Sequence, residues 1–311
     1  MDTCEMMVFK DCKDTSAISG FLLQDRKSSK YVQELVSLYD EQDGSKKNNN
    51  NISNTIKIDW KNFRKFDNVK IEASSKEGIL CIRADKFPDR TYYVGKPTSD
   101  QWFAIPNHKP VDQFPTEQVG LVVLTSDPLT FKMVTLSPKC GANRATNYYG
   151  YRCDVFDSRT WTWKRGINDV VLPKMVLFVR QNESLVVNGL IHWLTTDGRV
   201  VVFDHEDETY RRFPLPKGVN SLRSSLIEYE GKLGLVTTSE KEGKQLWVVE
   251  DDDDSRHHHN WRLIKQQNQD FRSIGILVVQ ETEVMKFGGF CAQHVFPFRS
   301  NFEPIRLEGG A

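Results

Sequence analysis

The stretch VVNGLIHWLTTDGRVVVFDHEDETYRRFPLP, from Val186 to Pro216, decides the fold class. Asn188-Gly189 is a pair that accepts positive φ, which predicts a tight hairpin turn before the strand 190–194. The acidic run 204–208 stands between an apolar strand and an aromatic one, so it is interpreted as a solvated hairpin turn. On this interpretation, His192 lies on the strand 190–194 and is predicted to be a hydrogen-bonded histidine of the core. The stretch therefore predicts antiparallel strands and no catalytic or metal-binding cluster.

Glycines recur at comparable points along the chain: Gly78, Gly120, Gly189, Gly231 and Gly275. Three of the four steps between them are a little over forty residues, and the longer step contains the insertion 138–152. Such a period matches one four-stranded propeller blade of about 40–50 residues. The sequence therefore predicts an all-β fold, a β-propeller of about six blades over residues 56–311. An N-terminal strand segment and polar linker are expected over residues 1–55.

A second repeat supports the blades. Segments 92–106, 153–166, 200–216 and 246–264 each contain an apolar strand, a turn rich in polar residues and a strand that carries aromatic residues. Large rings suit the flat surfaces that one blade presents to the next. We therefore expect most of the tryptophans to be largely buried between blades, namely Trp102, Trp163, Trp193, Trp247 and Trp261.

Charge and hydropathy narrow the classes of function. Basic and acidic residues balance at 42 each, whereas a protein that grips nucleic acid through phosphates usually has a basic excess. The start of the chain does not resemble a targeting signal, and no apolar run approaches the ~20 residues of a membrane-spanning helix. The sequence thus predicts a cytoplasmic or nuclear protein that binds neither nucleic acid nor membrane.

Reactive residues do not form a recognisable site. The six cysteines contain no CxxC pair, so free thiols are expected. His257, His258 and His259 are consecutive, and neighbouring side chains of an extended segment point to opposite faces. No histidine has a Ser or Cys partner at nucleophile spacing, and no glycine-rich phosphate loop is present. We expect no enzyme activity, no metal and no cofactor.

Four ordered segments resemble one family. SSKEGILCIRA…YYVGKPTSDQWFAIP, CDVFDSRTWTWKRG, SLVVNGLIHWL…VVVFDHEDETYRRFPLP and LIEYEGKLGLV…LWVVED…NWRLI are similar to successive motifs of the F-box-associated domain of plant F-box proteins. The resemblance covers about residues 71–265. It implies a kelch-like propeller that binds a target protein, while the F-box docks on a Skp1-like adaptor of a cullin-based ubiquitin ligase.

The chain departs from the family's pattern in one respect. Nothing before Ser19 resembles an F-box, whose packed helices take roughly 40 residues of amphipathic sequence. The polypeptide is therefore expected to bind a Skp1-like adaptor only if a longer form carries the F-box. A truncated gene model, a degenerate copy and a natural decoy remain three alternative explanations.

The insertion 138–152 is the candidate binding loop. It contains the Tyr and Arg residues typical of protein interfaces, namely Arg144, Tyr148, Tyr149, Tyr151 and Arg152. These residues are predicted to bind an unknown target protein from an exposed loop. A propeller that binds a small ligand such as a glycan in its central channel is the alternative.

Overall fold

The structure is a computed structural model. Its described residues are 18–27, 30–37, 55–57, 61–63, 66–86, 89–107, 116–139, 148–179, 183–239, 243–250, 260–267, 286–287, 290–291, 294–300 and 303–307. Within them the only helices are two 3₁₀ turns, η1 (Lys61–Phe63) and η2 (Ser221–Arg223). The remaining regular structure is antiparallel β-sheet, as the sequence predicts.

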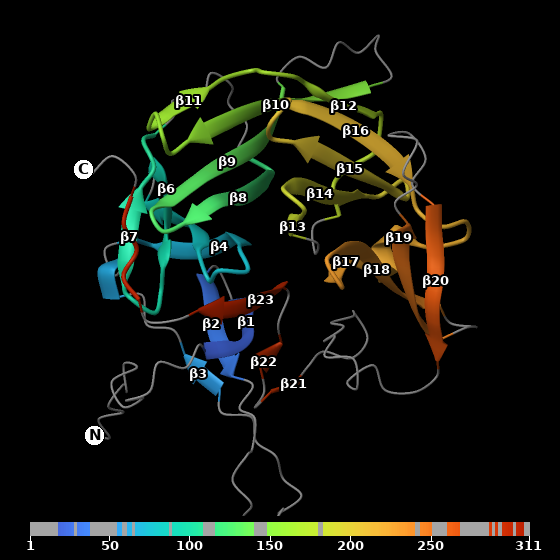
Figure 1. The fold of residues 1–311 in the computed structure, drawn as a ribbon, viewed down its shortest axis with the longest axis horizontal. Helices are drawn as coiled ribbons and strands as arrows, with labels where there is room; N and C mark the ends of the chain where they lie inside the picture. Colours follow the sequence, from blue (N-terminus) through green and yellow to red (C-terminus); the bar gives the residue numbers. More distant parts are fainter. Residues whose placement is uncertain are drawn as a thin grey trace, which may run out of the picture.

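Five large sheets fan around a central axis (Figure 1). Blade 1 contains, from the inside outward, β23 (His294–Ser300), β1 (Ile18–Lys27), β2 (Lys30–Ser37) and β3 (Thr55–Lys57). Blade 2 contains β4 (Asn68–Ser74), β5 (Leu80–Lys86), β6 (Asp89–Lys96) and β7 (Gln101–Ala104). Blade 3 contains β8 (Gln118–Ser126), β9 (Leu129–Pro138), β10 (Tyr148–Asp157) and β11 (Thr162–Lys164), and β12 (Val170–Pro173) also pairs with β10.

The ring continues with two further blades. Blade 4 contains β13 (Leu185–Val187), β14 (Leu190–Thr195), β15 (Arg199–Asp204) and β16 (Thr209–Pro214). Blade 5 contains β17 (Ser224–Tyr229), β18 (Lys232–Ser239), β19 (Gly243–Glu250) and β20 (Asn260–Gln267). A two-stranded pair, β21 (Lys286–Phe287) and β22 (Phe290–Cys291), follows them. The propeller architecture is confirmed, and the number of six blades stays a prediction.

Blade 1 joins the two ends of the described chain. β1 pairs with β23, so that Ile18 lies opposite Ser300 and Leu22 opposite Phe296. The expected division at residue 55 is therefore not where the sheet ends, because β3 belongs to the same sheet as β1 and β2. The long sequence separation of β1 and β23 explains the difference, since a local pattern carries no information about such a pairing.

The turns follow one scheme. Asn188 and Gly189 have φ values of 50° and 76°, which confirms the predicted hairpin turn. The residue before the outer strand also has a positive φ in three blades, at Asp100, Trp161 and Glu208. The Asp204 carboxylate accepts the backbone N–H of Glu206 at 2.8 Å. The acidic run is thus a turn that satisfies its own backbone.

The core lies between the blades. The cluster that joins blades 3 and 4 includes Val134, Leu136, Ile191, Trp193 and Phe203, all inaccessible to solvent. The two sheets approach closely at Gly120, where an added Cβ would lie 2.7 Å from the Ile191 side chain and 3.1 Å from the Trp193 ring. A glycine is required there because any side chain would separate the two sheets.

In three blades, the second residue of the outer strand is aromatic and forms a hydrogen bond with the preceding blade. Trp163 of β11 donates its indole N–H to the Pro106 carbonyl at 2.8 Å, and Trp261 of β20 donates to the Pro214 carbonyl at 2.9 Å. Tyr210 of β16 accepts the backbone N–H of Val171 at 3.2 Å. Each of these residues is the second of its strand. The repeat predicted from the sequence is therefore a repeated contact between blades.

The burial expected for the tryptophans holds in part. Trp193 is 0% exposed, as predicted. Trp102, Trp163, Trp247 and Trp261 are partly buried and pack against the core clusters, so they are less buried than Trp193. Three of them lie on outer strands, at the perimeter of the propeller.

We expect Trp193→Ala to lower the free energy of unfolding by about 3–5 kcal/mol, because it opens a cavity between two sheets that cannot collapse. Chemical denaturation followed by circular dichroism measures the change. The outer-strand variant Trp102→Ala is the control and should cost less. Equal losses would contradict the central position of Trp193.

A separate test concerns the indole hydrogen bonds. Trp163→Phe and Trp261→Phe should each cost about 1 kcal/mol, since each removes one hydrogen bond between blades and keeps an aromatic ring. Trp247→Phe is the matched control, because the Trp247 N–H bonds Gln245 of the same strand at 3.3 Å. A control loss as large as the other two would show that these bonds do not stabilise the contact between blades.

Candidate protein-interaction face

The described end of the predicted binding loop is a strand. β10 begins at Tyr148, and its first residues pair with β12, with Tyr148 opposite Pro173 and Tyr149 opposite Leu172. The side chains of Tyr148 and Tyr149, and the whole of Arg144, lie outside the described residues. The proposal that these three bind a partner therefore stays a prediction.

Tyr151 and Arg152 are buried. Tyr151 is 2% exposed, and its ring lies edge-on to that of Phe178, with 5.0 Å between the ring centres. Arg152 is 8% exposed and donates from Nε to the Asp154 carboxylate at 2.9 Å. Their prediction as exposed interface residues is wrong, because β12 covers this end of β10. Both residues serve the packing of blade 3.

The antiparallel blades give the propeller two distinct faces. In blades 2 to 5, the turns from the first to the second strand and from the third to the fourth lie on one face, here called the hairpin face. The turns from the second to the third strand, and the connections between blades, lie on the opposite face, here called the connection face. In blade 1, the turn between β1 and β2 also belongs to the connection face.

Exposed apolar side chains gather on the connection face. Among the described residues, five large hydrophobic side chains are exposed, and four of them belong to β12 and to the links after blades 3 and 4. These four form what we call the apolar patch: Val171 at 40% exposed, Met175 at 77%, Leu177 at 43% and Leu222 at 52%. The fifth, Leu263, lies on β20. Apolar side chains gathered on one face mark a candidate interaction surface.

Hydrogen bonds hold the links of the apolar patch together. The Thr196 N–H donates to the Leu177 carbonyl at 2.9 Å, and the Leu177 N–H donates to the Thr196 hydroxyl at 3.1 Å. The Ser221 hydroxyl donates to the Thr196 carbonyl at 3.2 Å. The turn of blade 4 thus ties the segment of Met175 to that of Leu222, so the patch is preorganised.

Local turn chemistry presents the two most exposed side chains. Met175 has a φ of 70°, a conformation that is uncommon for a residue with a long side chain. The turn that contains Met175 is closed by a hydrogen bond from the Val176 N–H to the Pro173 carbonyl at 3.0 Å. Asn220 caps η2 by accepting the Leu222 N–H at 2.9 Å. A strained conformation at an exposed methionine is a feature often found at functional sites.

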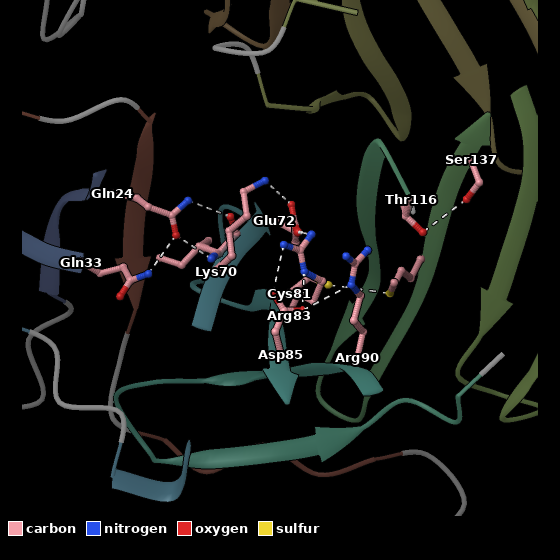
Figure 2. A network of polar contacts seen from close by, with 12 residues as sticks. Gln24, Gln33, Lys70, Glu72, Cys81, Arg83, Asp85, Arg90, Thr116 and Ser137 are labelled. Atoms are coloured by element: carbon pink, nitrogen blue, oxygen red, sulfur yellow. Dashed lines mark hydrogen bonds and ion pairs between the residues drawn. The ribbon is translucent and has the colours of Figure 1, made fainter. Parts of the chain in front are cut away.

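A chain of ion pairs lies on β4 and β5 of blade 2. Figure 2 shows Lys70, Glu72, Arg83 and Asp85 in succession across neighbouring strands. Lys70 lies 2.5 Å from the Glu72 carboxylate, which also bonds Arg83, and Arg83 bonds Asp85 at 2.9 Å. Burial alone would lower the pKa of Lys70, but attraction by Glu72 and Glu183 and the hydrogen bond to Glu72 together outweigh burial and raise that pKa. The charges satisfy one another, so this network is structural.

Buried glutamines continue the same network toward blade 1. Gln24 donates to the Ile71 carbonyl at 3.2 Å and accepts the Ile71 N–H at 2.7 Å. Gln33 donates to both Gln24 and the Val69 carbonyl. These side chains from β1 and β2 bind the edge of β4 where no backbone partner is available. They fix the angle between the two blades.

Cys81, Cys153 and His192 are buried within the blades. Burial raises the pKa of the Cys153 thiol to about 12, and burial with the nearby Glu72 charge raises that of Cys81. His192 is 5% exposed and bonds the Leu185 carbonyl at 3.2 Å, as the sequence predicts. The described residues contain no group of three potential metal ligands, and His257 to His259 lie outside them.

A hollow of about 410 Å³ lies between blades 3 and 4 on the hairpin face. Its charged side chains bond one another or the backbone: Lys164 pairs with Glu208, Arg159 with Asp157, and Lys132 donates to the His205 carbonyl. Because these charged side chains already have partners, few polar groups of the hollow remain to bind a ligand. The expected alternative of a small-ligand site gains no support from this hollow.

The comparison with protein families decides the class. Residues 19–281 match the model of the family described as F-box protein At3g26010-like, beta-propeller. The chain belongs to this family. The F-box propeller family match begins at residue 19 and includes β1 and β2, in agreement with their place in blade 1.

The chain is also similar to F-box proteins of Arabidopsis thaliana. F-box protein At5g49610 is 28% identical over 191 residues, which cover 56% of this chain and 50% of the relative. Putative F-box protein At1g32420 is 32% identical over 186 residues, covering 56% of this chain and 54% of the relative. The chain thus spans about half the length of the curated relatives it matches.

Among solved structures, TolB from Acinetobacter baumannii is similar at a TM-score of 0.44 and 12% identity, covering 83% of this chain and 55% of that one. At that level it carries no further weight. No helix within the described ranges is long and apolar enough to cross a membrane.

Cys81 and Cys153 should resist alkylation in the folded protein at about pH 8, because their raised pKa values keep the thiols protonated and burial blocks access. Peptide mass mapping after iodoacetamide treatment measures the modified fraction. The same chain unfolded in urea is the control and should be modified at both positions. Rapid modification of either thiol in the folded chain would contradict the structural role.

Proposed function

We propose that this chain is the target-binding propeller of an F-box-type substrate receptor, and that it acts by binding a protein without catalysing a reaction. Membership of the F-box propeller family supports the class. Ubiquitination through a Skp1-like adaptor and a cullin is the outcome proposed for a form that carries an F-box. In that assembly the propeller selects the protein that is modified.

The observation that carries the proposal is the apolar patch on the connection face. Its side chains are exposed, yet the links that bear them are fixed by hydrogen bonds to the turn of blade 4. Fixed apolar groups lose little conformational freedom on association, which favours binding. Methionine adapts to partners of different shape and is enriched at interfaces.

The test is affinity capture with the full chain as bait, from the source tissue, with a proteasome inhibitor present. The double variant Met175→Ser with Leu222→Ser should lose the proteins that the unchanged chain captures, because it removes the apolar anchors and adds no charge. Its melting temperature should stay within a few degrees, since exposed side chains contribute little to the core.

Leu263→Ser is the matched control, because it removes an exposed leucine from β20 outside the apolar patch. It should retain the captured proteins. Undiminished capture by the double variant would place target binding elsewhere on the propeller. Equal loss in the control would show that general surface hydrophobicity causes the capture.

A further inference from the structure

The charged residues that lack an ion-pair partner divide between the two faces of the propeller. On the hairpin face, six exposed acidic residues have no such partner among the described residues: Glu77, Asp100, Asp127, Glu206, Asp207 and Glu230. Basic residues of the same turns are paired, as Lys76 is with Glu228 and Arg159 with Asp157. Arg306 is an exception, an exposed cation next to the turn of blade 3. The hairpin face is therefore mainly acidic.

The connection face shows the opposite distribution. Four exposed cations there lack a carboxylate partner within the described ranges: Arg26, Lys30, Lys174 and Lys217. The acidic Asp197 of the blade 4 turn is neutralised by Arg212 at 2.7 Å and lies 3.7 Å from Arg199. Asp67 is the exception on this face. Among the residues that the structure describes, the exposed charges without an ion-pair partner are thus segregated between the two faces of the propeller.

Two of the free cations border the apolar patch. Lys174 directly precedes Met175, and Lys217 lies in the link that leads to Leu222. A partner that covers the patch therefore meets positive charge on the links after both blade 3 and blade 4. Complementary charge at the rim of an interface steers the partner and fixes its orientation, whereas the apolar centre supplies most of the affinity.

We propose that the connection face over blades 3 to 5 binds an acidic polypeptide segment that also carries apolar side chains. This inference rests on the proposed function and specifies the chemistry of its partner. The carboxylates of the segment would lie near Lys174 and Lys217, and its apolar side chains would cover Met175, Leu177 and Leu222. The acidic hairpin face repels the same segment, so the two faces are not interchangeable.

A polypeptide fits this surface better than a nucleic acid does. Nucleic-acid sites combine a dense row of cations with exposed aromatic rings on which bases stack. The apolar patch instead consists of Val171, Met175, Leu177 and Leu222, all aliphatic or thioether side chains. Aliphatic side chains of a peptide match such a surface.

The experiment uses the full chain and a fluorescein-labelled peptide of alternating Glu and Leu, with a Lys-for-Glu peptide as the comparison. Fluorescence anisotropy measures the Kd of each. The acidic peptide should bind, and its Kd should rise with salt because exposed charges are screened. The basic peptide should bind at least about tenfold more weakly, since it meets like charge.

Charge-reversal variants locate the site. The double variant Lys174→Glu with Lys217→Glu should raise the Kd of the acidic peptide by about tenfold or more at low salt. Lys232 is the exposed first residue of β18 and directly follows the β17–β18 turn of the hairpin face. Arg306→Glu with Lys232→Glu therefore produces the same change in net charge on the hairpin face, and the Kd of the acidic peptide should change by less than about twofold. Both double variants should melt near the temperature of the unchanged chain.

Three results would overturn the inference: equal loss in both double variants, equal affinity for both peptides, or tighter binding of a single-stranded RNA of the same charge. The proposed function can be judged apart from it. If Met175→Ser with Leu222→Ser abolishes target capture while the charge reversals leave both capture and peptide binding unchanged, the face binds protein by another chemistry. If neither variant affects capture, the proposed function fails as well.

Discussion

A four-stranded antiparallel sheet with two apolar surfaces cannot bury both of them alone, and this constraint organises the whole molecule. Each blade must lie against a neighbour, and the core is accordingly found between sheets. Gly120 allows blade 3 to approach Trp193 of blade 4. At the perimeter, Trp163 and Trp261 bond the carbonyls of the preceding blade. Central packing supplies stability, and these outer bonds set the angle between sheets.

The sequence was sufficient to predict the strands and turns of the blades, because short-range patterns determine them. Asn188-Gly189 and the acidic run after Phe203 have the predicted turns. The prediction that Tyr151 is exposed was wrong because it relied on the frequency of tyrosine at interfaces and not on the position of Tyr151 in the sequence pattern. Tyr151, Cys153 and Val155 alternate along β10, and this spacing of two is the signal of a buried strand face. The pairing of β1 with β23 left no local signal at all.

The candidate site was missed for a related reason. Val171, Met175 and Leu177 lie in an ordinary apolar segment of the sequence, and composition alone does not reveal which of them are exposed. Their exposure depends on hydrogen bonds with Thr196 and on the turn after Pro173, which bring separate links together. The polar network around Glu72 shows the reverse case. Its charged residues stand out in the sequence, but they pair with one another within the fold and are not available to a partner. Surface function in this fold thus depends on which side chains the packing leaves free.

The sheet of blade 1 has a consequence for synthesis of the chain. Its inner strand, β23, is translated long after β1 and β2, so the ribosome delivers the other blades while the β1 edge still lacks its partner. An unpaired edge strand is a template for association with other chains. Nascent copies on neighbouring ribosomes would therefore compete with β23 for the same edge. The yield of folded protein therefore depends on whether β23 is synthesised before the edge of β1 pairs with another chain. A chaperone that shields β1 during synthesis would raise that yield.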